Sequence, residues 1–291
     1  MKKLSIFALA VCLPCAAFAD SAGEELYLNI RRIGMDVSKT SVRHSAEYAD
    51  SPIQAFTADD QEFIKGVFDT ALEYDLGRLN WDNSLFMEYG RTTLKPYNEP
   101  KTINENADKI LLTSDLSYAA WDYDSFKIGP MVRAAYETEF VASDGVPRQK
   151  VFRTNAGLSL FDHPIIKTLY ISGVYEYDFT YGHHQVSKLA AEVGWRAEYE
   201  LRDGVNFSTN GYYREYLDYS EYVPTDLERD FSGIVRMDTN LWGDFTMGPY
   251  AQYRRGRARG ADHYASNFII GISFNYITKF GLITLPESES K

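Results

Sequence analysis

Residues 188–201, KLAAEVGWRAEYEL, alternate strictly between two kinds of side chain. The odd positions from Leu189 to Leu201 are all apolar or aromatic, and the even positions include Lys188, Arg196 and three glutamates. Because successive side chains of a strand point to opposite faces, this period of two predicts one long β-strand. One of its faces requires an apolar environment, and the other requires water or ion partners.

The same alternation recurs in residues 126–140 and 169–181. Strands of soluble sandwiches are typically about 5–6 residues long, whereas a tilted strand needs roughly 9–11 residues to cross the hydrocarbon of a bilayer. The length of these runs therefore favours strands that span a membrane. In lipid, a sheet satisfies every backbone hydrogen-bonding group only by closing on itself.

Twelve segments follow this pattern. They are residues 26–38, 64–76, 79–93, 109–121, 124–140, 150–161, 167–181, 186–201, 204–219, 228–241, 244–256 and 265–280. The apolar phase of the first segment switches near Arg31-Arg32, which predicts a β-bulge there. The predicted fold class is thus all-β: a single closed antiparallel transmembrane β-barrel of about 12 strands.

The connections between the segments alternate in length. The short ones are Gly77-Arg78, Asp122-Tyr123, residues 162–167, Arg202-Asp203-Gly204 and Gly243-Asp244, and the long ones are residues 39–63, 94–108, 141–149, 220–227 and 257–264. Short periplasmic turns and longer extracellular loops are typical of bacterial outer-membrane barrels. The loop around Gly182-His183-His184 is the one short connection on the predicted extracellular side.

The first 19 residues read as a secretory signal peptide. Lys2 and Lys3 precede an apolar stretch, and Ala17-Phe18-Ala19 is a small-x-small cleavage site before Asp20. We expect a signal peptide over 1–19, a barrel over 20–280 and a short periplasmic tail over 281–291. Both cysteines lie in the signal, so the mature chain would lack disulfides, and its 28 basic and 41 acidic residues would give a net charge of −13. That balance disfavours a nucleic-acid partner.

Charged residues that alternate with the apolar ones would face the interior of the barrel, and they are the candidates for lining its lumen. The selected residues are Asp69, Glu73, Glu88, Asp115, Lys127, Arg133, Arg153, Glu176, Lys188, Arg196, Arg214, Arg236 and Arg254. They predict either a pore in which an acidic wall faces a mixed wall, or a narrow interior in which these groups neutralise one another. Both interpretations stay open, and no catalytic residue, metal or cofactor is expected.

Two further groups of residues are candidates for binding or chemistry. Arg255, Arg257 and Arg259 lie at the end of the eleventh segment and in the loop after it, and they are candidate contacts for lipopolysaccharide phosphates; the alternative is a solvated loop. His183 and His184 lie in a predicted loop near Ser187, where an outer-membrane hydrolase could set a nucleophile and a base. With no third group identifiable, solvated histidines are the simpler interpretation.

Residues 81–121 carry a resemblance to known proteins. WDNSLFMEYGRTTLK and ADKILLTSDLSYAAW contain Trp81, Asn83, Tyr89, Gly90, Asp108 and Lys109 in a pattern that resembles uncharacterised outer-membrane β-barrel families, known as domains of unknown function. The resemblance implies location and architecture but no activity. Separately, the last segment ends in Phe280, which resembles the signal read by the outer-membrane assembly machinery.

The sequence therefore predicts an integral outer-membrane protein of a Gram-negative bacterium, with outer-membrane lipid, lipopolysaccharide and the assembly machinery as partners. The leading function is a narrow channel for small charged solutes or a structural barrel. The alternatives are an outer-membrane enzyme acting on lipid or peptide, and a protein that binds or adheres through its loops.

Overall fold

The computed structural model describes residues 25–48, 51, 53–57, 61–94, 102–142 and 147–284. The predicted signal peptide, its cleavage site and residues 285–291 lie outside these ranges. The strands are β1 (Glu25–Arg43), β2 (Gln61–Leu76), β3 (Leu79–Leu94), β4 (Thr102–Tyr118), β5 (Trp121–Tyr123), β6 (Phe126–Thr138), β7 (Lys150–Phe161), β8 (Ile166–Tyr181), β9 (His184–Arg202), β10 (Val205–Tyr219), β11 (Leu227–Trp242), β12 (Phe245–Ala258) and β13 (Ala265–Thr284).

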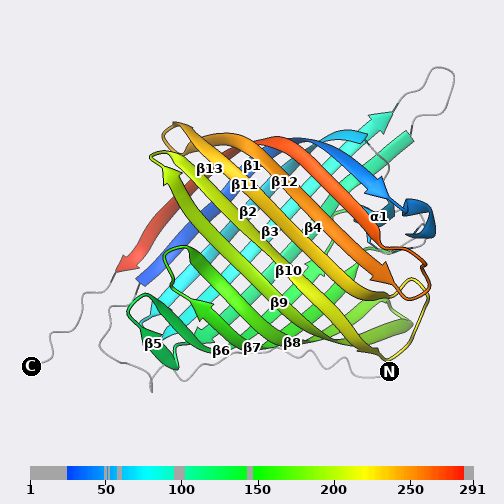
Figure 1. The fold of residues 1–291 in the computed structure, drawn as a ribbon, viewed down its shortest axis with the longest axis horizontal. Helices are drawn as coiled ribbons and strands as arrows, with labels where there is room; N and C mark the ends of the chain where they lie inside the picture. The colour runs from blue at the N-terminus through cyan, green and yellow to red at the C-terminus, as the bar shows by residue number, and fades with distance from the viewer. Residues whose placement is uncertain are drawn as a thin grey trace, which may run out of the picture.

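These strands form one antiparallel barrel, which confirms the predicted fold class (Figure 1). Each long strand pairs with its neighbours in the chain, β1 pairs with β13, and the additional pairing of β4 with β6 completes the ring. Twelve strands are long, from 12 residues in β7 to 20 in β13, and the three-residue β5 is an extra piece. Among the described residues, no helix has the length and apolarity needed to cross a membrane.

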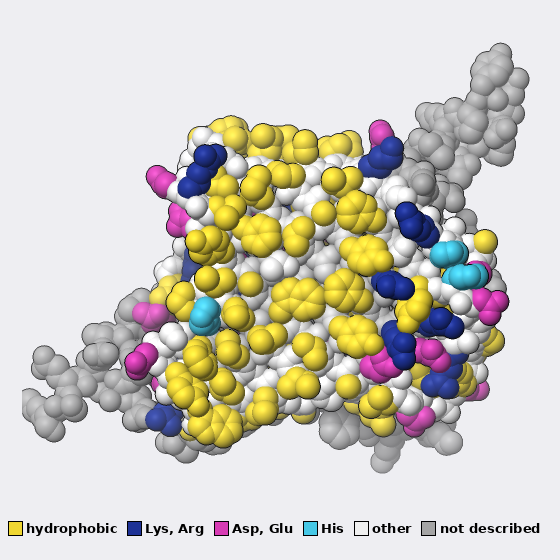
Figure 2. All heavy atoms as spheres, in the orientation of Figure 1, with side chains coloured by type: hydrophobic (Ala, Val, Ile, Leu, Met, Phe, Trp, Pro, Cys, Tyr) yellow, Lys and Arg dark blue, Asp and Glu magenta, His cyan; other side chains and the backbone are white. Residues whose placement is uncertain are grey.

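The barrel is apolar on its outside and polar on its inside. Ile171 and Leu217 are 61% and 63% exposed, whereas Glu176 and Arg214 are 3% and 6% exposed. Hydrophobic side chains accordingly cover most of the face drawn in Figure 2. This distribution is the reverse of that in a water-soluble protein, and it is the one that a strand alternating between lipid and an enclosed interior requires.

The two ends of the barrel differ. Glu25 pairs with Thr284, so the chain enters and leaves at the same end, which we call the turn end. Its connections include Gly77-Arg78, Asp203-Gly204 and Gly243-Asp244. Each glycine there has a positive φ, of 70°, 71° and 53°, a conformation that side chains with a Cβ disfavour. The opposite end, with most of the longer connections, is the loop end.

Several boundaries differ from those predicted. The turn expected at Asp122-Tyr123 lies instead at Asp124-Ser125, because Asp122 and Tyr123 belong to β5, which pairs with the start of β6. The predicted strand 109–121 is thus divided between β4 and β5. In addition, β1 continues to Arg43 and β4 begins at Thr102, so both of the long loops near them are shorter than expected.

The last strand also runs past its predicted end, to Thr284, which places the first four residues of the expected tail in β13.

The bulge predicted in β1 is confirmed. The register of β1 shifts between Ile30 and Ile33 against β13, and between Ile30 and Arg32 against β2. As a result, two consecutive side chains contact interior residues: Arg31 contacts Glu73, and Arg32 donates to the Asn275 side chain. A regular strand would have directed one of the two arginines to the outer face.

Candidate functional site in the barrel interior

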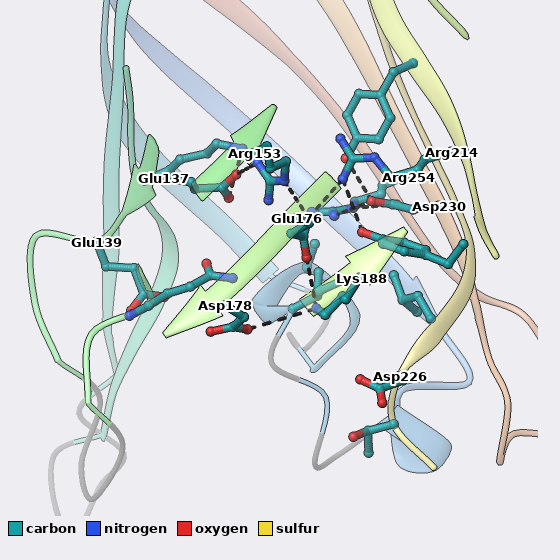
Figure 3. A pocket seen from close by; sticks show the side chains of 18 of the residues that line it. Glu137, Glu139, Arg153, Glu176, Asp178, Lys188, Arg214, Asp226, Asp230 and Arg254 are labelled. Atoms are coloured by element: carbon teal, nitrogen blue, oxygen red, sulfur yellow. Dashed lines mark hydrogen bonds and ion pairs between the residues drawn. The ribbon is translucent and has the colours of Figure 1, made fainter. Parts of the chain in front are cut away.

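The central feature of the interior is a chain of ion pairs on β6 to β10, which we call the central ion network: Glu137, Arg153, Glu176, Lys188 and Arg214. Arg153 lies 2.6 Å from Glu137 and 2.6 Å from Glu176. Glu176 also lies 2.9 Å from the Lys188 ammonium and 3.5 Å from the Arg214 guanidinium. Figure 3 shows Arg153, Lys188 and Arg214 converging on Glu176, which therefore holds three cations.

Strand register explains why these residues meet. Arg153 is directly opposite Glu176, and Glu176 is directly opposite Lys188. Directly opposed side chains on one face of a sheet have Cβ atoms about 4.5–5.5 Å apart, so opposite charges at such positions attract. Arg214 is likewise opposite Glu192 on β9, and its Nε donates to that carboxylate at 2.7 Å.

The network continues around the wall on both sides. Asp230 accepts hydrogen bonds from Arg254 and from the Tyr212 hydroxyl, each at 2.8 Å. On the other side, the Tyr170 hydroxyl donates to Glu192 at 2.7 Å and accepts from Arg133 at 2.9 Å. Buried charges are stabilised when they are paired and fully hydrogen-bonded, and this band of the interior meets that condition.

A second group of pairs lies on β2 to β4, where all the predicted lining residues are acidic (Asp69, Glu73, Glu88 and Asp115) and formed the expected acidic wall. Glu73 and Asp82 are directly opposed across β2 and β3, and Arg31 contacts both of them from the β1 bulge. Glu88 lies 2.7 Å from Lys65. Because these cations come from β1 and β2 themselves, this side of the interior carries mixed charge.

The loop after β1 folds over the interior. Its short helices η1 (Ser45–Tyr48) and α1 (Gln54–Thr57) carry two fully buried rings, Tyr48 and Phe56. The Tyr48 hydroxyl donates to the His263 carbonyl at 2.8 Å, and the Ala55 carbonyl accepts from Asn267 at 2.7 Å. We call the described residues of 44–57 the capping loop, since these contacts hold them against β13 and the connection that precedes it.

Beneath the capping loop lies a cavity of about 150 Å³, the loop-end cavity. Ile53 and Ala55 line it together with eight acidic and five basic side chains, a net charge of −3 if all are ionised. The charged residues are Glu88, Asp108, Lys109, Glu137, Glu139, Arg153, Glu176, Asp178, Lys188, Arg214, Asp226, Asp230 and Arg254. Figure 3 shows Asp178 and Asp226 on the loop side of the central ion network.

Asp226 stands in the connection between β10 and β11. Burial raises the pKa of its carboxyl, and a hydrogen bond from the backbone N–H of Val223 acts in the opposite direction. A cation in the cavity would favour the ionised form of this carboxylate.

The thirteen residues predicted to line the lumen occupy different parts of the interior. Glu88, Arg153, Glu176, Lys188, Arg214 and Arg254 line the loop-end cavity. Asp69 shares the inward phase of buried Lys65 and Val67, Glu73 pairs with Arg31, Asp115 pairs with Arg133, and Arg236 donates to Ser273.

The remaining two of the thirteen lie apart from the cavity. Lys127 pairs with Asp162 at 2.9 Å and donates to the Gly77 carbonyl, so it joins two turns at the turn end. Arg196 pairs with Glu198 on its own strand.

The structure also adds interior charges that the prediction left out, chiefly Arg31, Arg32, Asp36, Lys65 and Lys109. Lys65 and Lys109 share the inward phase of their strands, so alternation alone could have identified them. The direction of the Arg31 and Arg32 side chains depends on the bulge, and the sequence pattern does not predict which way a bulge turns each of them.

His184, predicted to lie in a loop, is the first residue of β9 and lies apart from His44 and His263 at the capping loop. His184 lies 3.1 Å from Glu221, and His263 lies 2.7 Å from Glu47 and stacks on His44. In the described part of the chain, no three His, Cys, Asp or Glu side chains are arranged to hold a metal ion.

The three arginines predicted to contact lipopolysaccharide do not share one contact in the structure. Arg255 and Arg257 lie over the Tyr264 ring, with guanidinium carbons 4.2 and 5.2 Å from its centroid. Arg259 instead lies over Tyr222 at 3.6 Å.

No protein-family model matches this chain, and no curated protein sequence matches it. The resemblance over residues 81–121 therefore stays a prediction. Among solved structures, the chain is similar to an outer membrane channel from Pseudomonas putida F1 (11% identity, 90% of this chain and 98% of that one, TM-score 0.41).

It is also similar to the outer membrane phospholipase A from Escherichia coli (10% identity, 84% and 90% coverage, TM-score 0.41) and to the translocator domain of the autotransporter NalP from Neisseria meningitidis (10% identity, 89% and 90% coverage, TM-score 0.35). At these values the likeness carries no inference about function.

Proposed function

We propose that this protein is an integral outer-membrane barrel that acts as a narrow channel for small charged solutes, with a preference for cations. The loop-end cavity, with its excess of acidic side chains, is the observation that carries the proposal. Rings of charged side chains select ions by sign, and acidic ones favour cations. The apolar outer wall and the closed sheet support the membrane location.

The interior also indicates how such a channel would behave. The capping loop covers the loop end, and all five residues of the central ion network line the cavity beneath it. A solute passing through would have to displace side chains of this network, because Glu176 and Arg214 are almost fully buried. We therefore expect a small conductance rather than the open flow of a wide porin.

Planar-bilayer recording of the full-length protein tests this function. Stepwise currents and a reversal potential in a KCl gradient that indicates cation preference are expected. Replacing Asp178 and Asp226 together with Asn should reduce that preference, because both carboxylates line the cavity. Glu215→Gln is the matched control, since Glu215 pairs with Arg229 on the outer face. A wild-type barrel that inserts but never conducts would indicate a structural role instead.

A further inference from the structure

A group of basic side chains lies on the outer wall at the loop end, apart from the interior site. Arg229 on β11 is directly opposite Arg257 on β12, and Arg255 follows two residues away on the same face. Arg43 on β1 and Arg255 on β12 both pair with Ser266 of β13, one on each side. We call Arg43, Arg229, Arg255 and Arg257, together with Tyr264, the outer arginine patch.

The patch concentrates positive charge without matching negative charge. Like charges directly opposed on a sheet repel each other, yet Arg229 and Arg257 occupy such positions. Glu215 is the one carboxylate that pairs with these arginines among the described residues, and it contacts Arg229 at 3.0 Å. The four arginines and this glutamate thus leave a net charge of about +3 on a small area of the wall.

Three of the four arginines, Arg229, Arg255 and Arg257, are held in place by Tyr264. Tyr264 accepts a hydrogen bond from Arg229 at 3.0 Å through its hydroxyl, and its ring lies under both Arg255 and Arg257. Cation–π contacts of this kind fix a guanidinium while leaving its N–H groups free to donate elsewhere. The geometry is therefore pre-organised for an anion with several oxygen atoms.

The position of the patch identifies the anion. Arg255 pairs with Ser266, and Phe268, two residues further along β13, is an exposed apolar side chain. Below it continue Ile270 and Ile272, which are half exposed on the same face. Figure 2 shows dark-blue side chains, with some magenta ones among them, at the loop end beside this broad hydrophobic field. An anion bound there sits at the boundary between hydrocarbon and water, where lipid headgroups lie.

We infer that the outer arginine patch binds the phosphate groups of a phosphorylated lipid in the membrane leaflet at the loop end. Arginine binds phosphate oxygens through paired, charge-assisted hydrogen bonds. The acyl chains of the same lipid would lie along the exposed side chains of Phe268 and Ile270. This site is independent of the proposed channel, because it lies on the opposite face of the sheet.

Native mass spectrometry of the full-length protein in a neutral detergent tests the inference. The probes are a diphosphorylated glucosamine lipid (lipid A) and its dephosphorylated form. The Arg255→Gln/Arg257→Gln variant should bind the phosphorylated probe about tenfold more weakly or worse. The Arg202→Gln/Lys167→Gln variant loses the same charge at the turn end and should bind normally. Heat-dependent gel migration shows that each variant is folded.

Three results would overturn the inference: unchanged binding by the patch variant, equal loss in the turn-end control, or equal affinity for the dephosphorylated probe. Competition between the lipid and millimolar inorganic phosphate is a further test. If it displaced the lipid completely, the site would be one for free phosphate rather than for a lipid headgroup. As a second variant, Tyr264→Leu keeps every charge but removes the ring, and it should weaken binding of the phosphorylated probe alone.

Discussion

Phe56 of the capping loop lies against the backbone of Gly256 in β12, at a distance that leaves no room for a side chain there. A Cβ atom at Gly256 would stand 2.5 Å from the Phe56 ring. The ring is fully buried, and the Arg254 guanidinium lies 5.5 Å from its centroid. The absence of a side chain at one position of the barrel wall therefore allows the loop to dock over the interior.

The first prediction concerns this contact. Gly256→Val should displace Phe56 and release the capping loop, and the single-channel conductance should rise as the loop end widens. Gly173→Ala is the control, since a Cβ there meets nothing within 4 Å. A Gly256→Val barrel with wild-type conductance and unchanged protease sensitivity of residues 44–57 would show that the loop does not limit passage.

The second prediction concerns the hub of the central ion network. Glu176→Gln leaves Arg153, Lys188 and Arg214 without the carboxylate they share, so we expect a loss of about 3–5 kcal/mol in the free energy of unfolding. Urea titration in lipid vesicles, followed by tryptophan fluorescence, measures the change. Glu198→Gln breaks the partly exposed pair with Arg196 and should cost only about 0–1 kcal/mol.

Equal losses for the Glu176 and Glu198 variants would contradict the central role of Glu176. A double variant offers a further check: Glu176→Gln combined with Lys188→Met should recover part of the loss, because it removes the cation whose only other carboxylate partner among the described residues, Asp178, lies 4.0 Å away.

The third prediction is a dependence on pH at the capping loop. The pKa of Glu47 is held below its ordinary value of 4.5, chiefly by the hydrogen bond from the His263 ring and also by backbone N–H groups of Asp262 and His263. A lowered carboxyl pKa contributes stability that is present above the ordinary value and is lost as pH falls through the lowered one. The loop should therefore stay docked near neutral pH and loosen below about pH 4.

Hydrogen exchange of residues 44–57 across pH measures this loosening. In Glu47→Gln the exchange of these residues should already be faster at neutral pH, and its additional acid-dependent increase should be smaller. If the variant retained the full acid response of the wild type, another group would have to control the loop.

Alternation in the sequence was sufficient to predict the barrel and the inward direction of many of its charged side chains. Lys188 and Glu176 belong to strands of regular period two, so their face follows from their position alone. The β1 bulge near Arg31-Arg32 was also predictable from the switch in apolar phase. The inward direction of both arginines was not predictable, because the face that each residue of a bulge takes depends on its hydrogen bonds to both neighbouring strands.

The capping loop could not be predicted for a different reason. Its docking depends on contacts between residues about 200 positions apart, such as Phe56 with Gly256 and Tyr48 with His263. Nothing in the local pattern of residues 44–57 encodes those partners. The outer arginine patch was found only in part, because Arg229 and Arg43 join Arg255 through strand pairing rather than through nearness in the sequence.

The last prediction tests the environment of the outer wall. Ile171 is 61% exposed and lies opposite Val193, another exposed side chain, in the middle part of the wall. In a lipid-facing position, Ile171→Arg should destabilise the barrel by about 2–4 kcal/mol in vesicles, whereas Tyr181→Arg, at the loop-end terminus of β8, should cost about 0–1 kcal/mol. Urea unfolding in vesicles of both variants gives the comparison. In a water-soluble protein, Ile171→Arg would not destabilise more than Tyr181→Arg, because an arginine at an exposed position is fully hydrated. Its cost in free energy is then small wherever it stands along the strand. Equal and small effects at the two positions would therefore contradict the membrane assignment itself, and with it the channel and the lipid site.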